Sequence, residues 1–126
     1  MTGTLEADGT SITSGTATKY ATLTLKYGVW LITGQIGYYN GNATAASISN
    51  KWHNINTSVA VNMLYGIRMN ATNSIGNGIE NHETLSRVVT VTSASQTYYL
   101  VAYVSYTGGP LTTYNQSSYF HAVRIA

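Results

Sequence analysis

The sequence contains no cysteine and very few charged residues. Only 8% of its 126 residues are charged, against about 25% in an average soluble protein. The absence of cysteine excludes disulfide bonds and thiolate metal sites, so the fold must be held together by packing or by association of subunits. Asn, Ser, Thr and Gly carry the polarity in place of ions. Such a composition is rare in cytosolic metabolic enzymes and common in extracellular β-structure and in parts of virus particles.

Basic clusters and long apolar runs are also missing. The six Lys and Arg residues are scattered and leave a net charge of +2, which gives nucleic-acid binding no electrostatic support. No run approaches the ~20 apolar residues that span a membrane. The first ten residues have neither the basic start nor the apolar core of a signal peptide. We therefore expect no nucleic-acid partner and no membrane insertion.

Alternation of apolar and polar residues with a period of two is the dominant pattern. It predicts about eight strands, at 5–13, 17–26, 29–39, 44–52, 58–70, 85–91, 98–106 and 119–126. Polar segments rich in Asn and Gly separate them, at 40–43, 73–83 and 107–118. The pattern is typical of an all-β sandwich or barrel over 17–126. Residues 1–16 are interpreted as a segment entering from an upstream shaft, or as a first strand.

Two stretches of the chain resemble a known family. "YGVWLITGQIGYY" (27–39) and the closing "SSYFHAVRIA" (117–126) resemble the early and last strands of the tip domains of bacteriophage tail fibres, a layout similar to C1q/TNF-like jelly rolls. The resemblance implies an antiparallel jelly-roll sandwich of about eight strands, a homotrimer, and an extracellular place at the tip of a virion tail fibre. These motifs are structural rather than catalytic. Tyr27 departs from the family pattern, in which proline often precedes the glycine.

The closing strand has no mainly polar face. Tyr119, His121, Val123 and Ile125 alternate with Phe120, Ala122, Arg124 and Ala126. We therefore expect one face of this strand to lie in the core of its own subunit and the other against neighbouring subunits.

Side chains able to perform chemistry are sparse. The acids are Glu6, Asp8, Glu80 and Glu83, and the last two share one predicted loop with His82. A glycosidase uses two preorganised carboxyl groups, whereas a loop rich in Gly and Asn holds its side chains loosely. No G-x-S-x-G motif and no H-x-x-x-H spacing occurs. We expect a non-enzymatic protein without cofactor or metal, and keep a glycan-degrading enzyme using Glu80 and Glu83 as an alternative.

Aromatic residues are the main candidates for binding. The chain has 11 Tyr and 2 Trp, whose flat apolar faces and polar tips suit interfaces and the stacking of sugar rings. Counting strands up and down places the connections 40–43, 71–84 and 107–118 at one end of the sandwich. The candidates are aromatic and polar residues in loops or at strand ends: Tyr39, Asn40, Asn42, Trp52, Asn81, His82, Tyr114 and Asn115.

The expected function is adsorption to a host cell. A tail-fibre tip would bind a cell-surface saccharide, or alternatively a protein receptor, with three sites per trimer adding avidity. A knob that only trimerises the fibre, without touching the host, is the other alternative.

Overall fold

The computed structural model describes residues 1–60, 66–69 and 73–126. In this part of the chain nine strands form one antiparallel sheet. A single 3-10 helix, η1 (Asn115–Ser117), lies between the last two strands, and no α-helix occurs among the described residues. The strands are β1 (Thr4–Leu5), β2 (Ser11–Ile12), β3 (Thr18–Asn40), β4 (Ala46–Asn56), β5 (Gly66–Met69), β6 (Asn73–Ile75), β7 (Ile79–Thr107), β8 (Leu111–Thr113) and β9 (Tyr119–Arg124). The predicted all-β, antiparallel class is confirmed.

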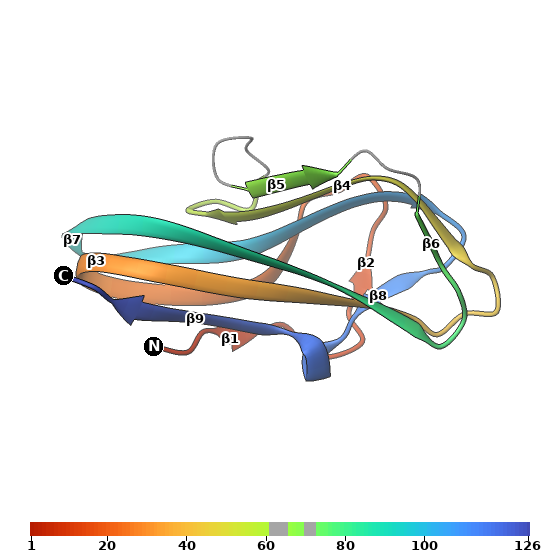
Figure 1. The fold of residues 1–126 in the computed structure, drawn as a ribbon, viewed down its shortest axis with the longest axis horizontal. Helices are drawn as coiled ribbons and strands as arrows, with labels where there is room; N and C mark the ends of the chain where they lie inside the picture. Colours follow the sequence, from red (N-terminus) through yellow and green to blue (C-terminus); the bar gives the residue numbers. More distant parts are fainter. Residues whose placement is uncertain (61–65, 70–72) are drawn as a thin grey trace.

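Two long strands, β3 and β7, form the frame of the molecule. They pair antiparallel from Thr18 opposite Ala102 to Asn40 opposite Ile79. Figure 1 shows both strands turning back at the end where the C-terminus lies. At this turn the register breaks between Lys26 and Gly28, and Gly28 has a φ of +141°, a conformation that glycine adopts without strain.

Contacts within β3 show that the paired strands fold over onto themselves. The Tyr20 hydroxyl donates a hydrogen bond to the Gly37 carbonyl, 17 residues along the same strand. A straight strand would separate these residues by roughly 56 Å. Gly34 faces Leu100 closely enough that a Cβ on Gly34 would lie 2.8 Å from the Leu100 Cδ1 atom. The two halves of the β3–β7 ribbon therefore make the two layers of a sandwich-like fold.

The core fills the space between these layers. The alternating face of Trp30, Ile32, Ile36 and Tyr38, predicted from the sequence, is buried. Leu85 and Val89 of β7 lie in the same layer, beside this face of β3, and belong to the same cluster. Residues of the opposite layer complete it, among them Leu23, Leu25, Ile48, Ile55, Tyr98, Leu100 and Val104. Aliphatic and aromatic burial of this kind stabilises the fold by roughly 25 cal/mol for each Å² removed from water.

Short strands cover the edges of the two long ones. Strand β4 lies beside β7 and carries β5 and β6 on its other edge, while β1, β8 and β9 lie along β3. The segment 1–16 contributes two short strands to the sheet: β1 pairs with β3 and β2 with β8, and the Met1 amino group donates to the Ala122 carbonyl at 2.9 Å. The closing strand β9 buries Phe120 and Ala122 in the core and exposes Tyr119 and Val123. The expectation that one of its faces enters its own core is confirmed.

Two expectations about local structure were wrong, and a third holds only in part. The predicted loop 73–83 contains β6 and the first residues of β7, because Ile79–Glu83 continue the hydrogen-bonded ladder along β3. The predicted loop 107–118 contains β8 and η1. Of the predicted strand 58–70, residues 58–60 form a bend and 66–69 form β5, and residues 61–65 and 70 lie outside the described residues.

Candidate functional site

Three connections meet at the end of the sandwich opposite the turns of β3 and β7. The Gly78 amide donates to the Asn40 carbonyl at 2.7 Å, which joins the β6–β7 turn to the end of β3. Gly108 packs so closely on the β3–β4 connection that a Cβ on it would lie 2.0 Å from the Ala45 carbonyl oxygen. The prediction that these connections share one end is confirmed, although two of them are shorter than expected.

Asn40 holds this end together. Its side chain is fully buried, and its Nδ2 donates to the Ile75 carbonyl at 2.8 Å and to the Thr44 carbonyl at 3.0 Å. Its Oδ1 accepts from the Asn42 amide at 2.9 Å. These three bonds occupy both ends of the amide, so Asn40 has a structural role, and its buried side chain is not exposed in the way that the other predicted contacts Tyr39 and Tyr114 are.

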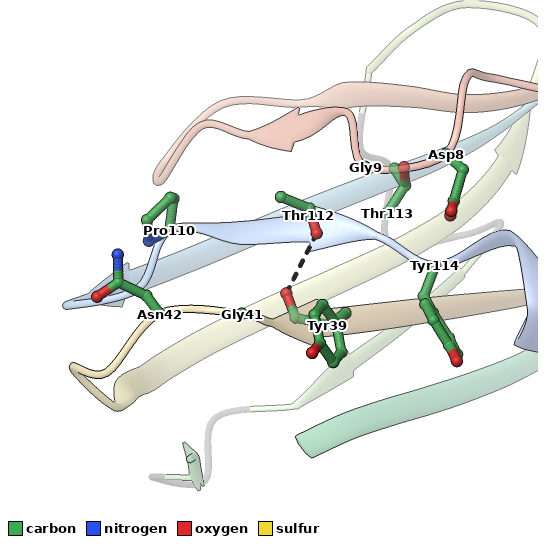
Figure 2. A pocket seen from close by; sticks show the side chains of 9 residues that line it. All are labelled: Asp8, Gly9, Tyr39, Gly41, Asn42, Pro110, Thr112, Thr113 and Tyr114. Carbon is green, nitrogen blue, oxygen red and sulfur yellow. Dashed lines mark hydrogen bonds between the residues drawn. The ribbon is translucent and has the colours of Figure 1, made fainter. Parts of the chain in front are cut away.

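An open cleft of about 460 Å³ lies beside this end of the molecule. Its walls come from the N-terminal segment, the end of β3 with the following turn, and β8 (Figure 2). The lining residues are Asp8, Gly9, Tyr39, Gly41, Asn42, Pro110, Thr112, Thr113 and Tyr114. Three predicted ligand contacts, Tyr39, Asn42 and Tyr114, are thus brought together.

Tyr39 and Tyr114 form the aromatic wall of the cleft. Their ring centroids lie 5.5 Å apart, with an angle of 23° between the planes. The backbone fixes both residues, because the Tyr114 amide donates to the Gly37 carbonyl at 3.0 Å and the Thr112 hydroxyl donates to the Tyr39 carbonyl at 3.4 Å (Figure 2). Both side chains are half-buried. The pair is therefore a positioned platform with its outer surface open to a ligand.

The opposite wall is the turn that carries Asp8. One Asp8 oxygen, Oδ1, accepts the Asn115 amide at 2.8 Å. Thr113 accepts from the Thr10 amide and donates to the Ala7 carbonyl, each at 3.0 Å, and so ties this turn to β8. Asn115, a predicted ligand contact, instead donates its Nδ2 to the Glu6 carbonyl at 2.8 Å and does not line the cleft.

The first residues of β7 extend the surface beyond Tyr39. Glu80 stands directly opposite Tyr39 and His82 opposite Gly37, which places both on the same face of the sheet as the aromatic ring. The His82 Nε2 lies 3.1 Å from a Glu80 oxygen. Asn81 stands opposite Tyr38 on the other face. Of the predicted pair Asn81 and His82, only His82 therefore adjoins the aromatic wall.

Trp52 and Glu83 lie apart from the cleft. Trp52 is a half-buried residue in the middle of β4, opposite Tyr103, and does not line the cleft. Glu83 points to the opposite face of β7 from Glu80, and its carboxylate accepts a hydrogen bond from the Lys51 ammonium group. The two carboxylates of the glycosidase alternative therefore do not face each other.

A polar cluster is buried between the layers. The Tyr38 hydroxyl bonds the Nε2 of His53, and the Lys51–Glu83 ion pair lies beside them. Burial lowers the pKa of His53 to about 3, with a smaller contribution from the Lys51 charge. Burial also raises the pKa of Tyr38 well above its usual value. None of these four residues lines the cleft.

Comparisons with protein-family models, with curated proteins and with solved structures find no match. In the described part of the chain, no group of three or more His, Asp or Glu residues is arranged to hold a metal ion. No helix among the described residues is long and apolar enough to cross a membrane. The function is therefore argued from the cleft itself.

Proposed function

We propose that this chain is a non-enzymatic saccharide-binding domain, the receptor-binding tip of a phage tail fibre that adsorbs to a host cell surface. The observation that carries the proposal is the stacked Tyr39–Tyr114 wall in an open cleft rimmed by hydrogen-bonding groups. The apolar face of a sugar ring packs on aromatic rings, while its hydroxyl groups need nearby polar partners. Asn42, Thr112 and Asp8 supply such partners.

Glu80 and Glu83 do not have the arrangement that glycoside hydrolysis requires. Glycosidases place two carboxyl groups on either side of one bond. Glu80 and Glu83 point to opposite faces of β7, and the Glu83 carboxylate is engaged by Lys51. The glycan-degrading alternative would need a different second carboxyl group.

The position of the cleft suits a fibre tip. It lies beside the end that carries the three connections, whereas the C-terminus lies at the opposite end, where β3 and β7 turn (Figure 1). Together with the resemblance of 27–39 and 117–126 to tail-fibre tips, this arrangement leads us to propose a jelly-roll tip domain exposed on the virion.

An apolar row across three strands supports the proposed homotrimer. Val88 of β7, Leu31 of β3 and Val123 of β9 stand side by side. They are 60%, 38% and 58% exposed, so this row presents apolar side chains to water in a single chain. Contiguous exposed apolar surface is uncommon in monomers and frequent at subunit contacts. We propose that this face packs against neighbouring subunits.

Sedimentation equilibrium tests the assembly. We expect a trimer for the unmodified protein and a monomer for Leu31→Asp, because a buried carboxylate without a partner opposes association. The matched control is Thr24→Asp, at an exposed position in the other half of β3. A monomeric unmodified protein would refute the proposed trimer.

A glycan array followed by calorimetry tests the binding function. Tyr114→Ala removes half of the aromatic wall and leaves the backbone bonds of Tyr114 in place. We expect it to weaken binding by about 10-fold or more, equivalent to about 1.4 kcal/mol. Tyr27→Ala, which removes a tyrosine that is 65% exposed at the other end, should have no effect. If the protein binds no glycan, or if Tyr114→Ala binds as well as the unmodified protein, the proposed site is wrong.

A further inference from the structure

The charged residue that lines the cleft and the residue that stands opposite Tyr39 are both acidic. Asp8 lines the cleft from the N-terminal segment, and Glu80 stands opposite Tyr39 on β7, on the same face of the sheet. Among the described residues that line the cleft there is no Lys, Arg or His. A ligand lying on the Tyr39–Tyr114 wall therefore has carboxylates beside it and no cation of the lining to balance them.

The Asp8 carboxylate is positioned and still able to accept a hydrogen bond. Its Oδ1 is fixed by the Asn115 amide at 2.8 Å, and within the described chain its other oxygen has no hydrogen-bond partner. Lys19, a base in the neighbouring part of β3, lies 3.1 Å from the carboxylate of Glu6 and is paired there. Glu80 has His82 as its partner, at 3.1 Å. Asp8 is thus the charged acceptor that the cleft itself presents.

We propose that this cleft selects neutral saccharides, and saccharides that carry a free amine, over acidic ones, and that Asp8 is the residue that imposes the selection. The inference rests on the proposed saccharide-binding function. Sugar hydroxyl groups donate to a carboxylate in short, charge-assisted hydrogen bonds. An ammonium group adds attraction, whereas the carboxylate of a uronic acid brings a like charge and an acceptor against an acceptor.

Matched glycans on an array, read out by calorimetry at about 0.15 M salt, test this selection. Each neutral glycan that binds is compared with two counterparts: one whose terminal hydroxymethyl group is oxidised to a carboxylate, and one in which a hydroxyl is replaced by an amine. We expect the acidic counterpart to bind at least about 5-fold more weakly than the neutral one, and the amine counterpart at least as tightly.

Asp8→Asn should shrink the difference between neutral and acidic glycans to about 2-fold or less and weaken binding of the amine counterpart by about 5-fold. Asparagine keeps an oxygen that can accept a hydrogen bond from the Asn115 amide, so the turn that carries residue 8 should keep its place beside the cleft. Ala94→Lys is the control for net charge, because it adds the same single positive unit at an exposed position in the turn of β7, at the other end of the molecule. It should leave the selectivity unchanged.

The possible results separate this inference from the function on which it rests. Glycan binding that depends on Tyr114 but favours acidic counterparts, or keeps its selectivity in Asp8→Asn, would overturn the role of Asp8 and leave the binding function intact. A selectivity change in Ala94→Lys as large as that in Asp8→Asn would also overturn it, because the effect would then follow net charge rather than the cleft. If no glycan of any charge binds, both the function and this inference are wrong.

Discussion

His53 should make the stability of this fold depend on pH. Its ring is 1% exposed, its Nε2 bonds the Tyr38 hydroxyl, and the charged groups nearby are Lys51 and Glu83. Burial lowers its pKa to about 3, whereas a histidine in the unfolded chain titrates near 6.5. Between these two values the unfolded chain binds a proton at this site that the folded chain does not.

The sign of the effect follows from this difference. Because the unfolded state binds more protons, the free energy of unfolding falls as the pH is lowered from about 6.5 toward 3, and the loss from this group ends below the folded pKa. From about pH 7 to about pH 4.5, the loss from His53 alone is about 2 to 3 kcal/mol. A domain whose total stability is about 5–15 kcal/mol would lose a substantial part of it.

Urea unfolding followed by tryptophan fluorescence, at about pH 7 and about pH 4.5, measures this loss. His53→Gln is the matched variant, since glutamine offers Tyr38 a hydrogen-bond partner and does not titrate. The carboxylates of the chain contribute to the pH dependence of both proteins. The difference between the stability lost by the unmodified protein and that lost by His53→Gln therefore isolates the contribution of His53. An equal loss of stability in the unmodified protein and in His53→Gln would refute the assignment of a buried, neutral histidine.

Three further changes test the packing by urea unfolding. Phe120→Ala should cost about 3–5 kcal/mol, because a fully buried ring leaves a cavity; a cost below about 1 kcal/mol would contradict its burial. Glu83→Gln should cost about 3 kcal/mol by leaving the Lys51 charge buried and unpaired, and adding Lys51→Met should restore most of it; no recovery would contradict the pairing. Gly108→Ala should cost at least ~2 kcal/mol and Gly78→Ala only about 1 kcal/mol. Both glycines have positive φ, but only the new Cβ at Gly108 would lie 2.0 Å from a backbone atom, the Ala45 carbonyl oxygen. Equal costs would contradict this contact.

The sequence predicted the class of fold because its core-facing residues repeat every second position. Trp30, Ile32, Ile36 and Tyr38 all point to one face of the strand, and all four are buried. The count of up and down strands also brought the correct connections to one end. Polar composition misled at 73–83: hydrogen bonding to β3 makes a strand of Glu80 and its neighbours although Asn, Gly and Glu disfavour strands.

The composition of the site was predicted in part. The loop aromatics Tyr39 and Tyr114 were found because tyrosines next to Asn-rich turns are suited to binding. Asp8 was missed because it enters the cleft through a contact with Asn115, which is 107 residues away in the sequence. No local sequence pattern predicts a contact between residues so far apart. The structural role of Asn40 did have a signal, since Asn side chains in an N-G-N turn commonly bond the backbone two residues on, as Asn40 does to Asn42.

The folded-over β3–β7 ribbon also constrains the order of events in synthesis and folding. Strand β3 gains β9 as its neighbour only after Phe120 has left the ribosome, and Met1 then docks on Ala122. The apolar residues of β3 therefore stay partly uncovered until most of the chain has been synthesised. Topologies dominated by such distant pairings fold slowly and pass through aggregation-prone intermediates. We expect a folding time of milliseconds to seconds, with aggregation during expression decided by that interval rather than by the stability of the finished fold.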